Sequence, residues 1–213
     1  MLELRDVQVD IASAQVLRGL NLQVGKGQMV GLVGRNGAGK TSTLRSIMGH
    51  LTPRMGQILF DGQDLVQMPA HARAGLGIGY MPEDRGLVPE LTVEESIVLP
   101  LWVSPTLSLD ERLAWVYDVL PELKAMSDRR ALLLSGGQQK LVALARALAV
   151  GTRLLLLDEP FEGVAPALSM RLSEVIRQLK STDLSVLIAQ SDTNHANDLL
   201  DAQVVIERGA NAA

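Results

Sequence analysis

Cysteine is absent from this chain of 213 residues, which excludes disulfide bonds and metal sites built from thiolates. Long hydrophobic runs are absent too. The longest, residues 97–103, is interrupted by Pro100, whereas a membrane-spanning helix needs about 20 apolar residues. The N-terminus carries Glu3, Arg5 and Asp6, so no signal peptide is expected. These absences predict a soluble chain, one that could still dock on a membrane component.

An excess of positive charge is also missing. The chain carries 20 basic and 24 acidic residues, which gives a net charge of −4, and no basic stripe stands out along it. Proteins that bind nucleic acid usually carry such a stripe, so we expect no nucleic-acid partner. The length allows one large domain or two small ones and is enough to bury a full core.

A glycine-rich stretch at residues 34–41 organises the rest of the sequence. It fits the G-x-x-x-x-G-K-[ST] pattern of a phosphate-binding loop and lies between an apolar strand at 28–33 and a predicted helix at 41–48. Glycine lets the backbone wrap around a polyphosphate with its N–H groups pointing inward, and the helix adds its positive end. The residues expected to bind the nucleotide are Gly34, Arg35, Asn36, Gly37, Ala38, Gly39, Lys40, Thr41 and Ser42.

Two acidic residues follow a second buried strand. Residues 153–157 are one arginine and four leucines, the profile of a central parallel strand, and Asp158 and Glu159 come directly after them. Open α/β sheets bind ligands at this end of their strands. We expect Lys40 to reach the β- and γ-phosphates, Asp158 and the Thr41 hydroxyl to hold Mg²⁺, and Glu159 to take a proton from the attacking water.

Further strands are indicated by alternating or short apolar patterns. They are expected near residues 2–9, 16–24, 57–60, 77–81, 185–189 and 203–207. Helical periodicity instead marks residues 136–150, 166–180 and 191–200, and it is the only pattern between about 90 and 135. The tail, residues 209–213, is low in complexity and expected to be mobile.

This alternation predicts the fold class. We expect one α/β domain with a P-loop NTPase core, at about 1–89 and 136–213, built on a mostly parallel sheet. A small N-terminal antiparallel β part completes the core. A helical subdomain is predicted as an insertion at about 90–135.

A second anion cradle precedes the helix at 136–150. Ser135 is a suitable N-cap, and Gly136, Gly137 and Gln138 follow it. The unpaired backbone N–H groups of such a helix start bind anions. Because one nucleotide needs one cradle, we interpret the second as serving a nucleotide bound to another subunit.

The motifs together resemble a known family. The phosphate loop, the stretch 134–138, and the leucines ending in Asp158, Glu159 and Pro160 are similar to the ATP-binding subunit of an ABC transporter, over nearly the whole chain. The resemblance implies ATP and Mg²⁺ as ligands, and two subunits packed head to tail around each ATP. It also implies permease subunits in the membrane, a solute-binding protein acting indirectly, and a peripheral location at the cytoplasmic face of the inner membrane.

A narrower resemblance concerns one branch of this family. Residues 80–85, 91–95 and 162–166 resemble the importers of branched-chain amino acids and their urea and amide relatives. Most ABC ATPases have a glutamine where this chain has Glu83, which the resemblance places on Mg²⁺ or its water. Ala165 stands where the usual D-loop aspartate would be, as it tends to in this branch.

Two positions depart from the wider family. The aromatic residue that usually stacks on adenine is Ile11 here, which can pack on the base but gives up stacking worth about 0.5–1.5 kcal/mol. The usual switch histidine is Gln190. Its amide carries a donor and an acceptor and could align the water beside Glu159. His195 is expected on the surface of the following helix.

Three interpretations compete. The first is an ATPase that drives an uptake transporter. The second is a non-transport ABC ATPase acting on DNA or ribosomes, which lacks support because the chain has neither a long coiled-coil insertion nor tandem halves. The third is a module that holds ATP without turnover, which Ile11 and Gln190 favour slightly and Lys40, Asp158 and Glu159 oppose. A P-loop kinase or GTPase is disfavoured, because neither needs a second cradle.

Overall fold

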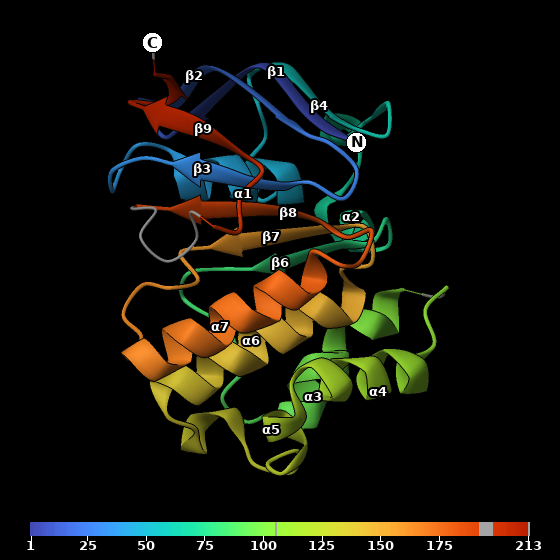
Figure 1. Ribbon diagram of the computed structural model, residues 1–213. Coiled ribbons are helices and arrows are strands. Elements are labelled where there is room, and N and C mark those ends of the chain that lie inside the picture. The colour runs from blue at the N-terminus through green and yellow to red at the C-terminus, as the bar shows by residue number, and fades with distance from the viewer. Residues whose placement is uncertain (105, 192–197, 213) are drawn as a thin grey trace.

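The computed structural model describes residues 1–104, 106–191 and 198–212 (Figure 1). An antiparallel sheet has the strand order β2-β1-β4-β5, and a mostly parallel sheet has the order β10-β9-β3-β8-β7-β6. The strands are β1 (Leu2–Ile11), β2 (Ala14–Val24), β3 (Met29–Val33), β4 (Met55–Phe60), β5 (Gln63–Asp64), β6 (Ile78–Met81), β7 (Leu154–Asp158), β8 (Ser185–Gln190), β9 (Ala202–Glu207) and β10 (Ala210–Asn211).

Helices lie on both faces of the large sheet. In Figure 1, α6 and α7 cover one face with α3, α4 and α5 beyond them, and α1 lies on the other. The α-helices are α1 (Lys40–Met48), α2 (Ala70–Ala74), α3 (Val93–Val98), α4 (Leu109–Val119), α5 (Pro121–Lys124), α6 (Gly136–Val150) and α7 (Pro166–Leu179). Short 3-10 helices occur at Leu65–Gln67, Leu99–Val103 and Ala131–Leu133. No helix of the described residues is long and apolar enough to cross a membrane.

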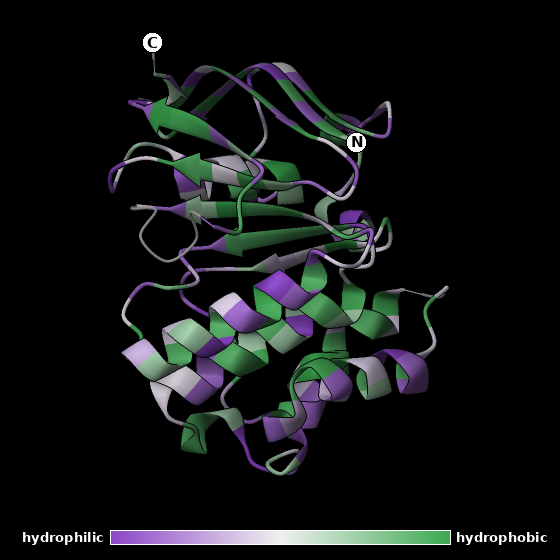
Figure 2. Cartoon of the chain, viewed as in Figure 1, coloured by the Kyte–Doolittle hydropathy of each residue, from purple (hydrophilic) through white to green (hydrophobic). Residues whose placement is uncertain are grey.

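The four leucines of β7 explain how two cores form around one sheet. Leu154 and Leu156 pack with α1 and the antiparallel sheet, whereas Leu155 and Leu157 pack with α6 and α7. Side chains of a strand point alternately to opposite faces, so a strand covered on both faces reads as a continuous apolar run. Figure 2 shows the central strands coloured mostly hydrophobic, as this arrangement requires.

The predicted fold class is confirmed: a mostly parallel sheet between helical layers, a small antiparallel sheet, and a helical region between β6 and α6. That region begins at Thr92, whose side chain accepts from the backbone N–H of Glu95 while the Glu95 side chain accepts from the Thr92 N–H. This reciprocal capping satisfies two donors at the start of α3. The described residues from 93 to 133 form helices, turns and bends, apart from a β-bridge between Arg130 and Thr92, and the subdomain boundaries near 90 and 135 stay a prediction.

The prediction of a mobile tail is wrong for residues 209–212. Strand β10 pairs with β9, and Asn211 exchanges two hydrogen bonds of 2.8 Å with the backbone of Asn21 on β2. The tail therefore ties the two sheets together. Most of the helix predicted at 191–200, with His195, lies outside the described residues.

Close packing of β6 on α6 gives the first testable prediction. A Cβ atom at Gly79 would overlap the carbonyl oxygen of Ala147, so Gly79→Ala should lower the free energy of unfolding by about 1–3 kcal/mol. Urea denaturation measures this loss. The control is Gly75→Ala, whose Cβ would lie 3.3 Å from the Ala72 oxygen and whose effect should stay within about 0.5 kcal/mol. Equal stabilities for both variants would contradict the packing.

Candidate active site

Three parallel strands bring the predicted site residues to one edge of the sheet. Val33 at the end of β3 pairs with Gln190 at the end of β8, and Asp158 at the end of β7 pairs with Ala189. The phosphate loop leaves β3 at the same edge. Residues that are more than 100 positions apart in sequence therefore meet where open α/β sheets bind ligands.

The phosphate loop depends on glycine at two points. Gly39 has a φ of 113°, in the left-handed region, and a Cβ there would lie 2.9 Å from the Leu17 side chain. At Gly34 a Cβ would overlap the carbonyl oxygen of Ile206. Helix α1 starts directly after Gly39 without a side-chain cap. Its first N–H groups are thus available to an anion, as the sequence predicted.

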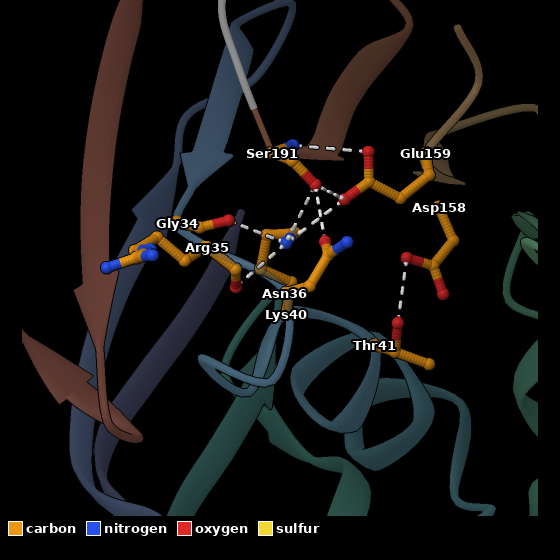
Figure 3. A network of polar contacts seen from close by, with 8 residues as sticks. All are labelled: Gly34, Arg35, Asn36, Lys40, Thr41, Asp158, Glu159 and Ser191. Atoms are coloured by element: carbon orange, nitrogen blue, oxygen red, sulfur yellow. Dashed lines mark hydrogen bonds and ion pairs between the residues drawn. The ribbon is translucent and has the colours of Figure 1, made fainter. Parts of the chain in front are cut away.

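Lys40 lies at the centre of a polar network (Figure 3). Its ammonium group donates to the backbone oxygens of Gly34 at 2.6 Å and Arg35 at 3.3 Å. It also forms an ion pair of 3.0 Å with a carboxylate oxygen of Glu159, and the two side chains are only 5% and 8% exposed. A buried charge is stable only when it is paired and hydrogen-bonded, and this network meets both conditions.

Glu159 is held on two sides. Its carboxylate accepts hydrogen bonds from the Ser191 hydroxyl at 2.6 Å and from the Ser191 backbone N–H at 3.1 Å. Its backbone has a φ of 46°, a left-handed conformation that is uncommon for a residue with a side chain and is frequent at functional sites. The fold thus fixes this carboxylate beside Lys40 in a conformation that local preference alone would not select.

Asp158 lies beside this network and contacts the start of α1. One carboxylate oxygen accepts from the Thr41 hydroxyl at 3.1 Å, and the other from the Tyr80 hydroxyl at 3.4 Å. Complete burial raises the pKa of Asp158 to about 6, the Thr41 hydrogen bond opposes this rise, and the nearby charges of Glu83 and Glu159 add to it. Negative charge thus accumulates here, an arrangement that favours a cation.

Gln190 is buried, and among the described residues neither its side-chain nitrogen nor its side-chain oxygen has a hydrogen-bond partner. Buried polar groups are nearly always satisfied, and an exception calls for an explanation. The backbone of Gln190 is engaged, because its carbonyl oxygen accepts from Gly34 N–H at 3.3 Å. The side-chain amide is the part of the residue still able to bind a ligand or water.

A cavity of about 410 Å³ opens above the phosphate loop. Its lining combines residues of the phosphate loop with Val16, Glu83, Glu159 and Glu162. Glu83 also lines an adjoining cavity with Thr41 and Asp158, so its predicted place near these residues fits. Ile11 lies at the end of β1, 42% exposed, and lines neither cavity. Its packing against adenine stays a prediction.

The second cradle lies apart from this cavity. The Ser135 hydroxyl accepts from the Gln138 backbone N–H, and the Gln138 side chain accepts from the Ser135 N–H. Ser135 and Gly136 are exposed, and the residues from Ser135 to Gln138 line neither the cavity above the phosphate loop nor the adjoining cavity beside Glu83. The cradle therefore faces outward, with the Ser135 hydroxyl proton and the helix N–H groups able to donate to an anion from elsewhere.

Comparison with known proteins adds a decisive observation. The family model described as ABC transporter matches residues 17–162. The chain belongs to the ABC transporter family.

Similar proteins come from more than one branch of the family. The chain is 33% identical to the high-affinity branched-chain amino acid transport ATP-binding protein BraG of Pseudomonas aeruginosa, over 98% of this chain and 90% of that protein. It is 32% identical to the lipopolysaccharide export system ATP-binding protein LptB of Escherichia coli, over 92% and 82%. A solved ATP-binding subunit of an ABC transporter superposes with a TM-score of 0.89 at 29% identity, over 100% of this chain and 88% of that one. The chain is thus an ABC ATPase, an enzyme that hydrolyses ATP. These similarities do not assign it to one transport branch of the family.

Sequence reasoning overlooked two residues of this ABC ATPase site. Ser191 directly follows Gln190, and its hydroxyl oxygen lies 2.6 Å from a Glu159 carboxylate oxygen and 2.7 Å from the Asn36 side-chain oxygen, so its one proton is donated to one of these acceptors at a time. Val16 lines the cavity from β2. A polar residue just past a buried strand at the ligand edge was a usable signal for Ser191. The position of Val16 depends on how β2 packs on the loop, which the sequence does not encode locally.

Ser191 gives the second prediction. Ser191→Ala removes the hydroxyl that binds the buried Glu159 carboxylate, so the free energy of unfolding without nucleotide should fall by about 1–3 kcal/mol. Urea denaturation measures it. Ser181→Ala is the control, because within the described part of the chain that exposed hydroxyl donates only to the Gln178 carbonyl, and its loss should stay within about 0.5 kcal/mol. A double mutant with Glu159→Gln should lose less than the sum of the single losses. Full additivity would refute a direct contact.

Proposed function

We propose that this ABC ATPase works as one of two subunits that close head to tail around ATP and power the uptake of branched-chain amino acids. The observation that supports the proposed dimer is that the chain's two anion sites lie apart from each other. The phosphate loop opens into a cavity with Lys40 and Glu159, while the Ser135 cradle faces outward on another surface. A second copy can present its cradle to the nucleotide on the first, and symmetry completes both sites at once.

Nucleotide binding is assigned to the phosphate loop. The N–H groups of the loop and of α1 surround the phosphates, and Lys40 exchanges its contacts with Gly34, Arg35 and Glu159 for phosphate oxygens. Arg35, Asn36, Gly37, Ala38, Gly39 and Ser42 supply the remaining contacts of the loop. Ile11 is assigned to pack against the adenine ring. Val16 offers a second apolar surface for it, because Val16 lines the cavity.

The residues beside the phosphate loop fit Mg²⁺. The Thr41 hydroxyl and Asp158 carboxylate are hard oxygen ligands 3.1 Å apart, and Glu83 lines the same cavity. No group of three or more His, Asp or Glu side chains in the described residues could hold a metal alone, and Mg²⁺ commonly takes one or two carboxylates plus phosphate and water. Bound there, Mg²⁺ would neutralise charge that develops on the phosphates.

Hydrolysis is assigned to Glu159 and Gln190. Glu159 is assigned to accept the proton of the attacking water, because its carboxylate lies beside Lys40, the residue assigned to the phosphates. Gln190 orients the water, because its unsatisfied amide has both a donor and an acceptor. Ser191 keeps the carboxylate in place through two hydrogen bonds.

The partners follow from the family. Permease subunits in the inner membrane receive the movement of the dimer from its cytoplasmic side, and a solute-binding protein acts on the permeases indirectly. The proposal of branched-chain amino-acid uptake is supported by similarity to BraG over 98% of the chain and by the segments around Glu83 and Ala165. Export of lipopolysaccharide is the second candidate, because similarity to LptB is nearly as high. Uptake of urea or amides is the third.

A transport experiment separates these functions. The chromosomal copy in the source organism is replaced by Glu159→Gln, and uptake of radiolabelled leucine and urea is compared with the parent strain. We expect loss of leucine uptake with urea uptake intact. Loss of urea uptake alone would assign the chain to the urea importers. Normal uptake of both with lipopolysaccharide missing from the cell surface would establish the export function.

The third prediction concerns Glu159 as the general base. Glu159→Gln keeps the shape of the side chain but cannot accept a proton, so turnover should fall by about 10²–10⁴-fold while ATP binding is kept. The variant should then accumulate as an ATP-bound dimer in size-exclusion chromatography. Asp183→Asn changes an exposed acid that forms an ion pair with Lys26 at the surface; it is the control and should behave like wild type. Turnover close to wild type in Glu159→Gln would remove Glu159 from this role.

The fourth prediction concerns Gln190. Gln190→Ala should lower turnover at saturating Mg-ATP by at least about tenfold while nucleotide affinity changes little, because its amide is assigned to the water and not to the phosphates. Because an amide does not titrate, Gln190 itself should add no step near pH 6.5 of the kind that a histidine would impose, and any step near pH 6 from Asp158 is separate from it. If turnover of Gln190→Ala matches wild type while Glu159→Gln is inactive, Gln190 has only a structural role.

A further inference from the structure

Lys140 is a buried lysine that the nucleotide site, as described so far, does not use. It lies on the second turn of α6 and is 4% exposed. Its ammonium group donates to two backbone oxygens, that of Glu159 at 2.8 Å and that of Glu162 at 2.6 Å. Burial of an ammonium group is costly unless its protons are bound, so these contacts fix the group in one place.

Both acceptors belong to the turn that carries Glu159, the proposed general base. The Glu162 backbone N–H donates to the Glu159 oxygen at 3.2 Å, which closes the turn, and Gly163 follows with a φ of 67°. The strained backbone of Glu159 needs support from its surroundings. Lys140 binds the peptide group of Glu159 itself, while Ser191 binds its carboxylate.

Helix α6 also carries the second cradle. Ser135 precedes Lys140 by five residues, a rise of about 7 Å along a helix. One rigid element therefore joins the residues proposed to receive the partner's nucleotide to the backbone of the base in the subunit's own site. We propose that Lys140 is a positioning residue for ATP hydrolysis, which fixes Glu159 relative to the cradle helix. This inference rests on the proposed role of Glu159.

The chain offers a matched control for this inference. Arg112 on α4 is partly buried and donates to two backbone oxygens of α6, that of Leu148 at 2.6 Å and that of Ala149 at 2.9 Å. These acceptors lie at the far end of α6 from Ser135. Replacing Arg112 with methionine therefore removes the same kind of contact from the same helix without touching the turn at Glu159.

The experiment compares purified Lys140→Met, Lys140→Arg and Arg112→Met. We expect Lys140→Met to lower the maximal turnover by about 10²-fold, the effect of a small misplacement of a catalytic group, with affinity for a fluorescent ADP analogue within about threefold of wild type. Lys140→Arg should recover most of the turnover, because it keeps the charge and the donors. Arg112→Met should keep the wild-type rate at temperatures where it is folded.

A double mutant distinguishes positioning from general damage. In the Glu159→Gln background, Lys140→Met should cause no further loss in single-turnover hydrolysis, because the group that it positions is already inactive. A further loss, or an equal loss of turnover in Arg112→Met, would overturn the inference. If Lys140→Met does not fold, Lys140→Gln undergoes the same comparison.

The outcomes separate this inference from the proposed function. Wild-type turnover in Lys140→Met with an inactive Glu159→Gln would overturn the role of Lys140 and leave the base intact. Wild-type turnover in Glu159→Gln would overturn the base itself, whatever Lys140→Met does.

Discussion

The buried ion pair between Lys40 and Glu159 is the interaction on which the site depends. Its 3.0 Å separation joins the phosphate loop, after β3, to the acidic end of β7, two segments that meet only because β8 lies between their strands. Neither charge would be stable in this position without the other. The parallel sheet, the left-handed backbone of Glu159 and the hydrogen bonds from Ser191 all serve to keep this pair in place. In the proposed mechanism, phosphate oxygens replace the present partners of Lys40, and Glu159 stays beside the reacting group.

The two anion sites have different environments, which suits different tasks. The phosphate loop and Glu159 line a cavity at the carboxyl ends of the strands. Interactions between charges are stronger there than in bulk water, because water is partly excluded. The cradle at Ser135 is exposed and already capped by its own side chains, so it is stable without a ligand. In the proposed dimer a second surface covers the cavity, and the cradle of each subunit contacts the nucleotide that its partner holds. Lys140 would then link that contact to Glu159 of the subunit that carries the cradle.

Motifs with local physics were predictable, and contacts between distant segments were not. The phosphate loop, the leucines before Asp158 and the N-cap at Ser135 follow from glycine geometry, apolar runs and capping, which are properties of neighbouring residues. Lys140 and Val16 acquire their roles from segments far away in sequence, so no local pattern marks them, whereas the place of Ser191 just past a buried strand was a usable signal. The tail was misjudged for the same reason, because the hydrogen bonds of Asn211 go to Asn21. Ile11 is a different case, because its place beside adenine was inferred from resemblance and can be tested only with the nucleotide bound.

The most direct test of the composite site uses two defects that lie on separate halves of it. Lys40→Ala disables the phosphate loop and Ser135→Arg fills the cradle, so each variant alone should be inactive. In a mixture, dimers that contain one chain of each kind regain one intact site, formed by the loop of one chain and the cradle of the other. ATP hydrolysis by the equimolar mixture should therefore rise to about a quarter of the wild-type rate, because half of the dimers are mixed and each has one of its two sites restored. If the mixture remains as inactive as the separate variants, each subunit does not lend its cradle to its partner, and the account is wrong.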